Sequence, residues 1–371
     1  NPFCDQWIKG TFECKNEKKT VDGFYDGDGV YKVRFMPSFV DTYTFKIESS
    51  FQTESAEEVS GSFEAVAPSA DNHGPVRVAG TYYLAYEDGK PYHCIGTTCY
   101  VWNLQNEKLQ EQTLKTLEEN AFNKIRFCIF PKHYDYNLHE PITYPYEGTP
   151  CDTSELNENN FAEYNGCAPG NDWDFTRFNP AHFQHIEECI KKLMALGIQA
   201  DLIVMHPYDR WGFSMMKAED DDRYWKYVLA RFSAYRNVWW SLANEYDLMH
   251  EKTLADWERY AAIICEKDPY HHLRSIHNCK AYYDYNLPWV THCSIQRTET
   301  YRSSELVNEW REKYHKPVVL DEICYEFDLS KPLWLDSTIN EFKRHSRARF
   351  YQDSFIDEID FDYLEIQIIE E

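Results

Sequence analysis

The chain has 371 residues, of which 43% are hydrophobic and 16% aromatic, and its formal net charge is −24 at pH 7. This composition supports a large core and excludes a disordered chain, and the length fits a barrel-sized domain with a smaller one beside it. The acidic balance argues against nucleic acid and anionic membranes as partners, because both are bound by clustered Lys and Arg. No apolar run approaches the roughly 18 residues of a transmembrane helix.

The N-terminal part, residues 1–72, predicts a small antiparallel β-sandwich of the immunoglobulin-like kind. The stretch "DGFYDGDGVYKVRFMP" joins Asp-Gly turn signals to alternating residues, and helical periodicity is absent. "DGDG" is interpreted as a turn, since the spaced ligands of a calcium loop are missing. The opening "NPFCDQWIKG" suggests that a preceding segment is missing. The polar stretch 67–75 marks the boundary to a second domain over 76–371.

Strands and helices alternate in this second domain, which predicts a (β/α)8 TIM barrel. Apolar strands alternating with helices indicate a parallel sheet, and no Gly-rich dinucleotide motif points to a doubly wound sheet instead. The long stretch 132–180 lacks periodicity and is expected to be a functional loop. The predicted strands are 90–102, 123–130, 198–205, 237–245, 272–278, 289–296 and 316–322. The predicted helices are 107–120, 182–197, 222–235, 253–268 and 303–314.

Two glutamates end predicted barrel strands, where such barrels carry their chemistry. Glu245 follows Asn244 in "WWSLANEYDL", and Glu322 ends "KPVVLDE". Two carboxyl groups across a cleft can cleave a glycosidic bond, one as a protonated acid and the other as an ionised nucleophile or base. Either glutamate alone is more simply a cap or a solvated group, but their joint position favours catalysis.

Other polar and aromatic residues near predicted strand ends are candidates for substrate binding. Asn244 could bond a sugar hydroxyl, and Arg126 could keep Glu322 ionised by a charge-assisted hydrogen bond. Arg126 could instead be a structural ion-pair partner. Gln296 could be a structural residue, and core positions are the alternative for His206, Trp102 and Trp211. The further candidates are Trp102, His206, Tyr208, Trp211, His277 and Gln296.

Three stretches, "FNKIRF", "SLANEYDL" and "KPVVLDE", resemble strand signatures of the clan A retaining glycoside hydrolases. The resemblance implies that Glu245 is the acid/base and Glu322 the nucleophile, with Asn244 and Arg126 as helpers. "RFCIFPKHYDYN", "MHPYDRWGFS" and "RSIHN" resemble more closely a bacterial branch of apiosidase-like and collagen-like-named glycosidases with an N-terminal β-sandwich. This resemblance covers roughly residues 20–326.

The C-terminal end of the barrel is atypical after about residue 326. It lacks the expected Gly-rich eighth strand, although 338–352 could form a helix and 361–369 a replacement strand. The alternative is a truncated product whose barrel does not close and which exposes edge strands.

These observations predict a glycosidase that acts on a carbohydrate substrate with retention of configuration and needs neither cofactor nor metal. No H-E-x-x-H or G-x-S-x-G motif supports a metal or serine hydrolase. The remaining alternative is a carbohydrate-binding protein without catalysis, or an inactive truncated glycosidase. Several of the 12 cysteines lie in predicted strands, and buried reduced cysteines suggest the cytoplasm. The suspected missing N-terminus leaves export open, and the sequence leaves the sugar and the oligomeric state undefined.

Overall fold

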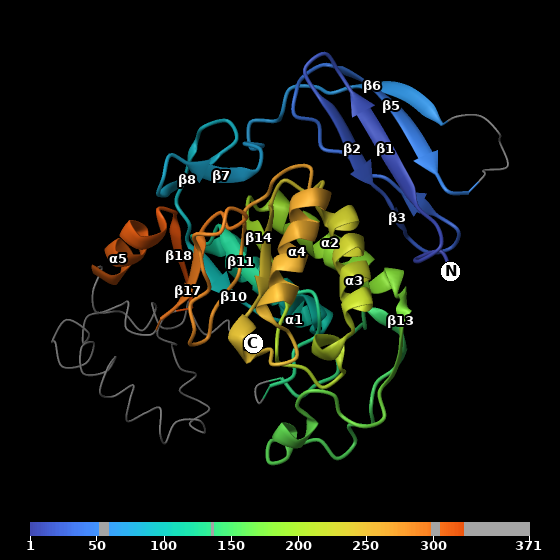
Figure 1. Ribbon diagram of the computed structural model, residues 1–371, viewed down its shortest axis with the longest axis vertical. Helices are drawn as coiled ribbons and strands as arrows, with labels where there is room; N and C mark the ends of the chain where they lie inside the picture. Colours follow the sequence, from blue (N-terminus) through green and yellow to red (C-terminus); the bar gives the residue numbers. More distant parts are fainter. Residues whose placement is uncertain (52–58, 135–136, 298–304, 323–371) are drawn as a thin grey trace.

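The computed structural model describes residues 1–51, 59–134, 137–297 and 305–322. Its N-terminal part is an antiparallel sheet, drawn in blue in Figure 1, with strand order β2-β1-β5-β6. A short hairpin, β3-β4, lies beside it and turns through Gly27, Asp28 and Gly29, all of which have positive φ. The predicted Asp-Gly turn is therefore confirmed. These strands are β1 (Ile8–Glu13), β2 (Lys18–Asp22), β3 (Phe24–Tyr25), β4 (Tyr31–Lys32), β5 (Thr42–Ser49) and β6 (Ser60–Glu64).

A second antiparallel sheet of three short strands connects this part to the rest of the chain. Its strands are β7 (Val76–Ala79), β8 (Tyr83–Tyr86) and β9 (Pro91–Tyr92). Val76, Leu84 and Tyr92 pack with Trp239 and Val319 of later strands in one buried cluster. The sequence predicted one strand over 90–102, but the structure divides that stretch into β9, β10 and a 3-10 helix, η1 (Trp102–Leu104).

In the part of the chain that the structure describes, seven parallel strands form the centre. Five are hydrogen-bonded in the order β10-β11-β14-β15-β16, and β17 pairs with β18. An isolated parallel bridge between His277 and Ser294 links the two groups, and β18 contacts β10. The strands are β10 (Gly96–Thr98), β11 (Lys124–Cys128), β14 (Gln199–Met205), β15 (Val238–Ala243), β16 (Arg274–Ser275), β17 (Cys293–Gln296) and β18 (Val318–Glu322).

Among the described residues, five α-helices alternate with these strands. Helices α2, α3 and α4 lie side by side on the outside of the sheet (Figure 1). Local sequence sets their ends. Asn179 caps α2, with Pro180 at its first position, and Thr253 and Asp256 form a capping box on α4. The five helices confirm the five predicted ones, within a few residues at each end. They are α1 (Glu107–Glu119), α2 (Pro180–Ala195), α3 (Ala218–Phe232), α4 (Leu254–Lys267) and α5 (Glu305–Tyr314).

The long connection after β11 has structure of its own. It holds a two-stranded antiparallel sheet of β12 (Tyr146–Thr149) and β13 (Asp172–Phe178), and a 3-10 helix, η2 (Phe161–Tyr164). The Trp173 indole donates to the carbonyl of Trp211, and Tyr146 packs on Phe178 and Phe213. These contacts attach the connection to the loop and 3-10 helix that follow β14.

The alternating parallel strands and outer helices make this an α/β barrel of the TIM type, preceded by an antiparallel region, as the sequence predicted. The predicted replacement helix 338–352 and strand 361–369 lie outside the described residues. Within the described residues, none of the helices has the length and hydrophobicity needed to cross a membrane. The cysteines in this part of the chain are free, and Cys99, Cys128, Cys189 and Cys293 are among the buried ones.

Candidate active site

The carboxyl ends of the parallel strands bring Glu245 and Glu322 to the same end of the barrel. Glu322 is the last residue of β18, and Glu245 comes two residues after β15. Both residues are buried: 6% of the surface of Glu322 and 4% of that of Glu245 is exposed. After burial, the negative charge of Glu322 is the next cause that raises the pKa of Glu245.

A β-bulge aims Glu322 into the barrel. Ile295 of β17 pairs with Leu320, but the next residue, Gln296, pairs with Glu322, so that Asp321 is one extra residue. In a regular strand neighbouring side chains point to opposite faces. Here both Asp321 and Glu322 contact interior groups, while Leu320 is exposed.

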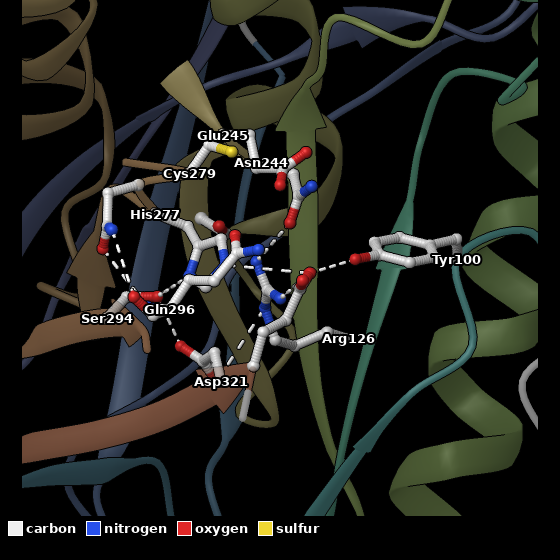
Figure 2. Close-up of polar contacts among 12 residues, drawn as sticks. Tyr100, Arg126, Asn244, Glu245, His277, Cys279, Ser294, Gln296 and Asp321 are labelled. Atoms are coloured by element: carbon white, nitrogen blue, oxygen red, sulfur yellow. Dashed lines mark hydrogen bonds and ion pairs between the residues drawn. The ribbon is translucent and has the colours of Figure 1, made fainter. Parts of the chain in front are cut away.

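The environment of Glu245 favours its protonated form. Burial and, next, the negative charge of Glu322 raise its pKa, and hydrogen bonds from Tyr208 and Cys279 and the charge of Lys132 only partly offset this. The Tyr208 hydroxyl donates to Oε2 of Glu245. The backbone of Glu245 has φ 51°, in the left-handed region that a non-glycine residue rarely adopts. Figure 2 shows Cys279 and Asn244 beside this carboxyl.

Tyr100 and Arg126 favour the carboxylate form of Glu322. The Tyr100 hydroxyl donates to its Oε1, and Arg126 Nη1 lies 3.6 Å from the same oxygen (Figure 2). His277 Nε2 lies 3.7 Å away. Burial, and next the charge of Arg126, lower the pKa of His277 to about 4, so that the imidazole is neutral at pH 7.

Hydrogen bonds determine which nitrogen of His277 carries the proton. The Ser294 hydroxyl donates to Asp321, whose pKa lies well below its usual range because the charges of Lys124 and Arg126 outweigh burial. The Ser294 oxygen therefore accepts a hydrogen from His277 Nδ1, 3.0 Å away. Nε2 is then an unprotonated acceptor, and it is buried with no hydrogen-bond partner among the described residues.

Asn244 also presents an unused polar atom. Its Oδ1 accepts from Arg126 Nη2 at 3.1 Å, and since a guanidinium can only donate, this contact fixes the orientation of the amide. The amide nitrogen is left buried without a hydrogen-bond partner in the described part of the chain. A buried donor of this kind is costly unless a ligand accepts from it.

Arg126 has a structural role as well. It belongs to a buried cluster with Lys124, whose Nζ lies 2.7 Å from Asp201 and 2.5 Å from Asp321, while Arg126 Nε lies 3.6 and 3.8 Å from the same carboxylates. The four side chains are at most 4% exposed. Both readings of Arg126 that the sequence left open, an ion-pair partner and a neighbour of Glu322, thus describe the same side chain.

The remaining candidates differ in how they are placed relative to the two glutamates. Tyr208 lies on Glu245, and Gln296 ends β17, where its backbone exchanges hydrogen bonds with the side chain of Asn278. His206 is buried, and its pKa is lowered to about 3, first by burial and then by the charge of Lys132.

Trp102 and Trp211 are each 1% exposed and belong to the hydrophobic core. Trp102 packs edge-on against Phe127, and Trp211 stacks on Phe213. This burial favours the core alternative over a sugar platform for both residues.

Three residues at the site were not among the sequence candidates: Tyr100, Lys132 and Cys279. Tyr100 follows β10 by two residues and Lys132 follows β11 by four. The signal for both was their position after a strand, but the sequence placed the first two strand ends too late. Cys279 follows the "RSIHN" stretch, where cysteine was interpreted only as a buried apolar residue.

A separate cavity beside these strands is not lined by the glutamate pair. It has a volume of about 440 Å³ and lies between β10 and β18, with Lys124, Arg126 and Asp321 in its wall. Neither Glu245 nor Glu322 lines it. We therefore locate the candidate site by the two carboxyl groups and their partners.

Comparison with protein families gives two matches. Residues 79–356 match a family described as the apiosidase-like catalytic domain, and residues 1–50 match a domain of unknown function, DUF5060. No curated protein matches the chain.

Among solved structures, a candidate glycoside hydrolase from Bacteroides vulgatus ATCC 8482 is 43% identical, with a TM-score of 0.79 over 88% of this chain. A glycoside hydrolase family 5 structure from the same organism is 18% identical, with a TM-score of 0.50 over 68% of this chain, which is a likeness of fold alone. This chain covers 61% and 54% of the lengths of these two proteins.

Proposed function

The chain belongs to the apiosidase-like catalytic domain family, and from this premise we propose that it hydrolyses O-glycosidic bonds with retention of configuration. The observation that carries the proposal is a pair of buried carboxyl groups with opposite surroundings. Glu245 has a raised pKa, with burial and the charge of Glu322 as causes, whereas Glu322 faces Arg126 and accepts from Tyr100. Such a difference separates an acid from a nucleophile.

The proposed reaction has two steps. In the first, a Glu322 oxygen attacks the anomeric carbon while Glu245 gives its proton to the leaving oxygen, so that the glycosidic bond breaks and a glycosyl ester of Glu322 forms. In the second, ionised Glu245 takes a proton from water, the water oxygen attacks the same carbon, and Glu322 leaves as a carboxylate.

Tyr208 occupies Oε2 of Glu245 as a donor. We propose that the other oxygen, Oε1, carries the proton that Glu245 transfers to the leaving group.

Two buried polar atoms are suited to hold the sugar. The Asn244 amide nitrogen can donate to a hydroxyl oxygen, and His277 Nε2 can accept from a hydroxyl. Asn244 accepts a hydrogen bond from Arg126, which also faces Glu322. His277 Nε2 lies beside Glu322 itself. We propose that they bind hydroxyl groups close to the reacting carbon.

Hydrolysis of a panel of aryl glycosides tests this function. We expect the wild type to cleave at least one of them with retention, seen by proton NMR of the first-formed sugar, and Glu322→Gln to lose at least about 1,000-fold in kcat. Glu312→Gln, an exposed glutamate on α5, is the matched control. Inversion of configuration, or unchanged rates in Glu322→Gln, contradicts the proposal. Glycan binding by a folded but inert wild type indicates a binding protein instead.

The acid role of Glu245 has a separate test. In Glu245→Gln, we expect a loss of about 100- to 10,000-fold for alkyl glycosides, whose leaving groups need a proton. The loss in glycosyl transfer to Glu322 should be much smaller for dinitrophenyl glycosides, which leave without one. Pre-steady-state release of the phenol measures this step. Equal losses for both classes of substrate contradict an acid role.

A further inference from the structure

Five side chains lie at or just after the carboxyl ends of five successive strands around the barrel. The strands lie in the order β18, β10, β11, β14, β15, with β18 in contact with β10 and the others hydrogen-bonded in turn. The side chains in the same order are Glu322, Tyr100, Lys132, Tyr208 and Glu245. Lys132 is thus in the middle, with a tyrosine and then a glutamate on each side.

The Lys132 ammonium contacts the faces of aromatic rings. Its Nζ lies 3.2 Å from the ring centroid of Tyr100, 4.4 Å from that of Tyr208 and 4.2 Å from that of Tyr134. Lys132 is only 4% exposed. A cation over an aromatic ring contributes about 2 kcal/mol when both groups are removed from water. The ammonium and the rings therefore hold one another in place.

Two of these three tyrosines each form a hydrogen bond with one of the two glutamates. The Tyr100 hydroxyl donates to Glu322, and the Tyr208 hydroxyl donates to Glu245. Figure 2 shows Tyr100 reaching the carboxylate from the side of the site opposite His277. A cation at the ring face also polarises a phenol toward stronger hydrogen-bond donation.

We propose that Lys132 is a positioning residue that holds Tyr100 on Glu322 and Tyr208 on Glu245 at the same time. This inference rests on the proposed function, because it concerns the same pair of glutamates. The proposed role of Lys132 in the reaction is indirect. It acts through the two phenols and through its charge.

The charges around Glu245 give the direction of the pH effect. Burial and Glu322 raise the pKa of Glu245, whereas Tyr208, Lys132 and Cys279 lower it. Loss of the Lys132 charge therefore keeps Glu245 protonated to higher pH.

Among the described residues, five other neighbours with resolved pKa shifts keep their charge state in the working range. The pKa of Cys279 is raised to about 12, chiefly by burial and by Glu245, and burial and Glu245 likewise raise that of Tyr208. His206 and His277 are neutral, with pKa values lowered to about 3 and 4, mainly by burial. Arg126, which faces Glu322, stays charged.

The test compares Lys132→Met with Lys132→Arg. We expect Lys132→Met to lower kcat about 100-fold, with a smaller change in KM, because displaced phenols and carboxyl groups lose their reactive alignment. The alkaline limb of kcat/KM should move to higher pH. Lys132→Arg, which keeps the charge and stacks on rings, should recover most of the rate. Lys108→Met, on the exposed face of α1, is the matched control.

The route through the phenols is tested in a Tyr100→Phe/Tyr208→Phe background. There we expect Lys132→Met to cost no more than about threefold further, because residues acting as one unit are not additive. An unchanged pH profile, together with a full 100-fold loss in this background, would mean that Lys132 only fills space.

A wild type inert on all glycosides overturns the proposed function but not this inference. Carbon-13 NMR of glutamate-labelled protein follows the Glu245 carboxyl directly, assigned by its absence in Glu245→Gln. We expect its titration midpoint to lie higher in Lys132→Met than in the wild type. Equal midpoints in folded proteins overturn the proposal for Lys132.

Discussion

Tyr208 shows how a single hydroxyl adjusts the proposed acid. It donates to Glu245 and so favours the ionised carboxylate, against burial and the Glu322 charge. We expect Tyr208→Phe to raise the pKa of Glu245 further and to move the alkaline limb of kcat/KM to higher pH. The expected fall in kcat is about 10-fold, because the second step needs Glu245 as a base.

The pH dependence of hydrolysis measures this effect. Tyr83→Phe, on an exposed ring of β8, controls for the loss of a phenol elsewhere. A shift to lower pH in Tyr208→Phe is incompatible with the hydrogen bond acting as described.

At the residue scale, the positions of Glu245 and Glu322 followed from one rule, that reactive groups gather at the carboxyl ends of parallel strands. The structure puts both there, while their roles stay predictions. Tyr100 and Lys132 also follow strands, but they were missed because the first two predicted strands end later than β10 and β11 do. Trp102 and Trp211 show the converse problem, because an aromatic residue near a strand end suits a core as well as a cleft.

At the scale of a single element, the bulge in β18 could not be predicted from the sequence. Alternation along "KPVVLDE" cannot show that Asp321 and Glu322 both point inward, because it assumes a regular strand. The inner contacts of Asp321, with Lys124 and Ser294, are what hold the extra residue in place. The carboxyl ends of β14, β17 and β18 were predicted correctly. β16, by contrast, is only two residues long where seven were expected, because tertiary contacts decide where its pairing stops.

The buried charges across β11, β14 and β18 give a stability prediction. Burial opposes the charge of Lys124, but Asp201 and Asp321 more than offset it and raise its pKa. In Lys124→Met, both carboxylates lose this partner inside the barrel. We expect the free energy of unfolding to fall by about 3–5 kcal/mol, measured by denaturant titration.

Lys191→Met removes a lysine from an exposed pair with Glu188 on α2 and should cost at most about 0.5 kcal/mol. If the two variants lose similar amounts, the buried cluster is not a major source of stability.

At the scale of the whole molecule, the antiparallel region is fastened to the barrel through buried ion pairs. Glu187 of α2 receives two hydrogen bonds from Arg34 and one from Arg231 of α3, and Arg231 also pairs with Asp26 at 2.7 Å. We propose that residues 1–72 form a separate domain. These contacts nevertheless imply that it unfolds together with the barrel.

Glu187→Gln should weaken this coupling. We expect amides of β1 and β5 to exchange hydrogen faster, by about 10-fold or more, while amides of β14 and β15 change less. Hydrogen exchange followed by mass spectrometry measures both regions in one sample. Glu188→Gln, the exposed neighbour, should change neither. Equal acceleration in both regions would instead indicate a general loss of stability.

The left-handed backbone at Glu245 has a consequence for the history of such a chain. That conformation costs an ordinary residue on the order of 1–2 kcal/mol, and removing the polar carboxyl group of Glu245 from water adds to this cost. Glycine or asparagine at this codon relieves both. Laboratory evolution that selects for heat resistance alone should therefore accumulate these substitutions. The variants would gain thermal stability and lose catalytic turnover. Persistence of glutamate in a lineage is, by this reasoning, a record that turnover was under selection.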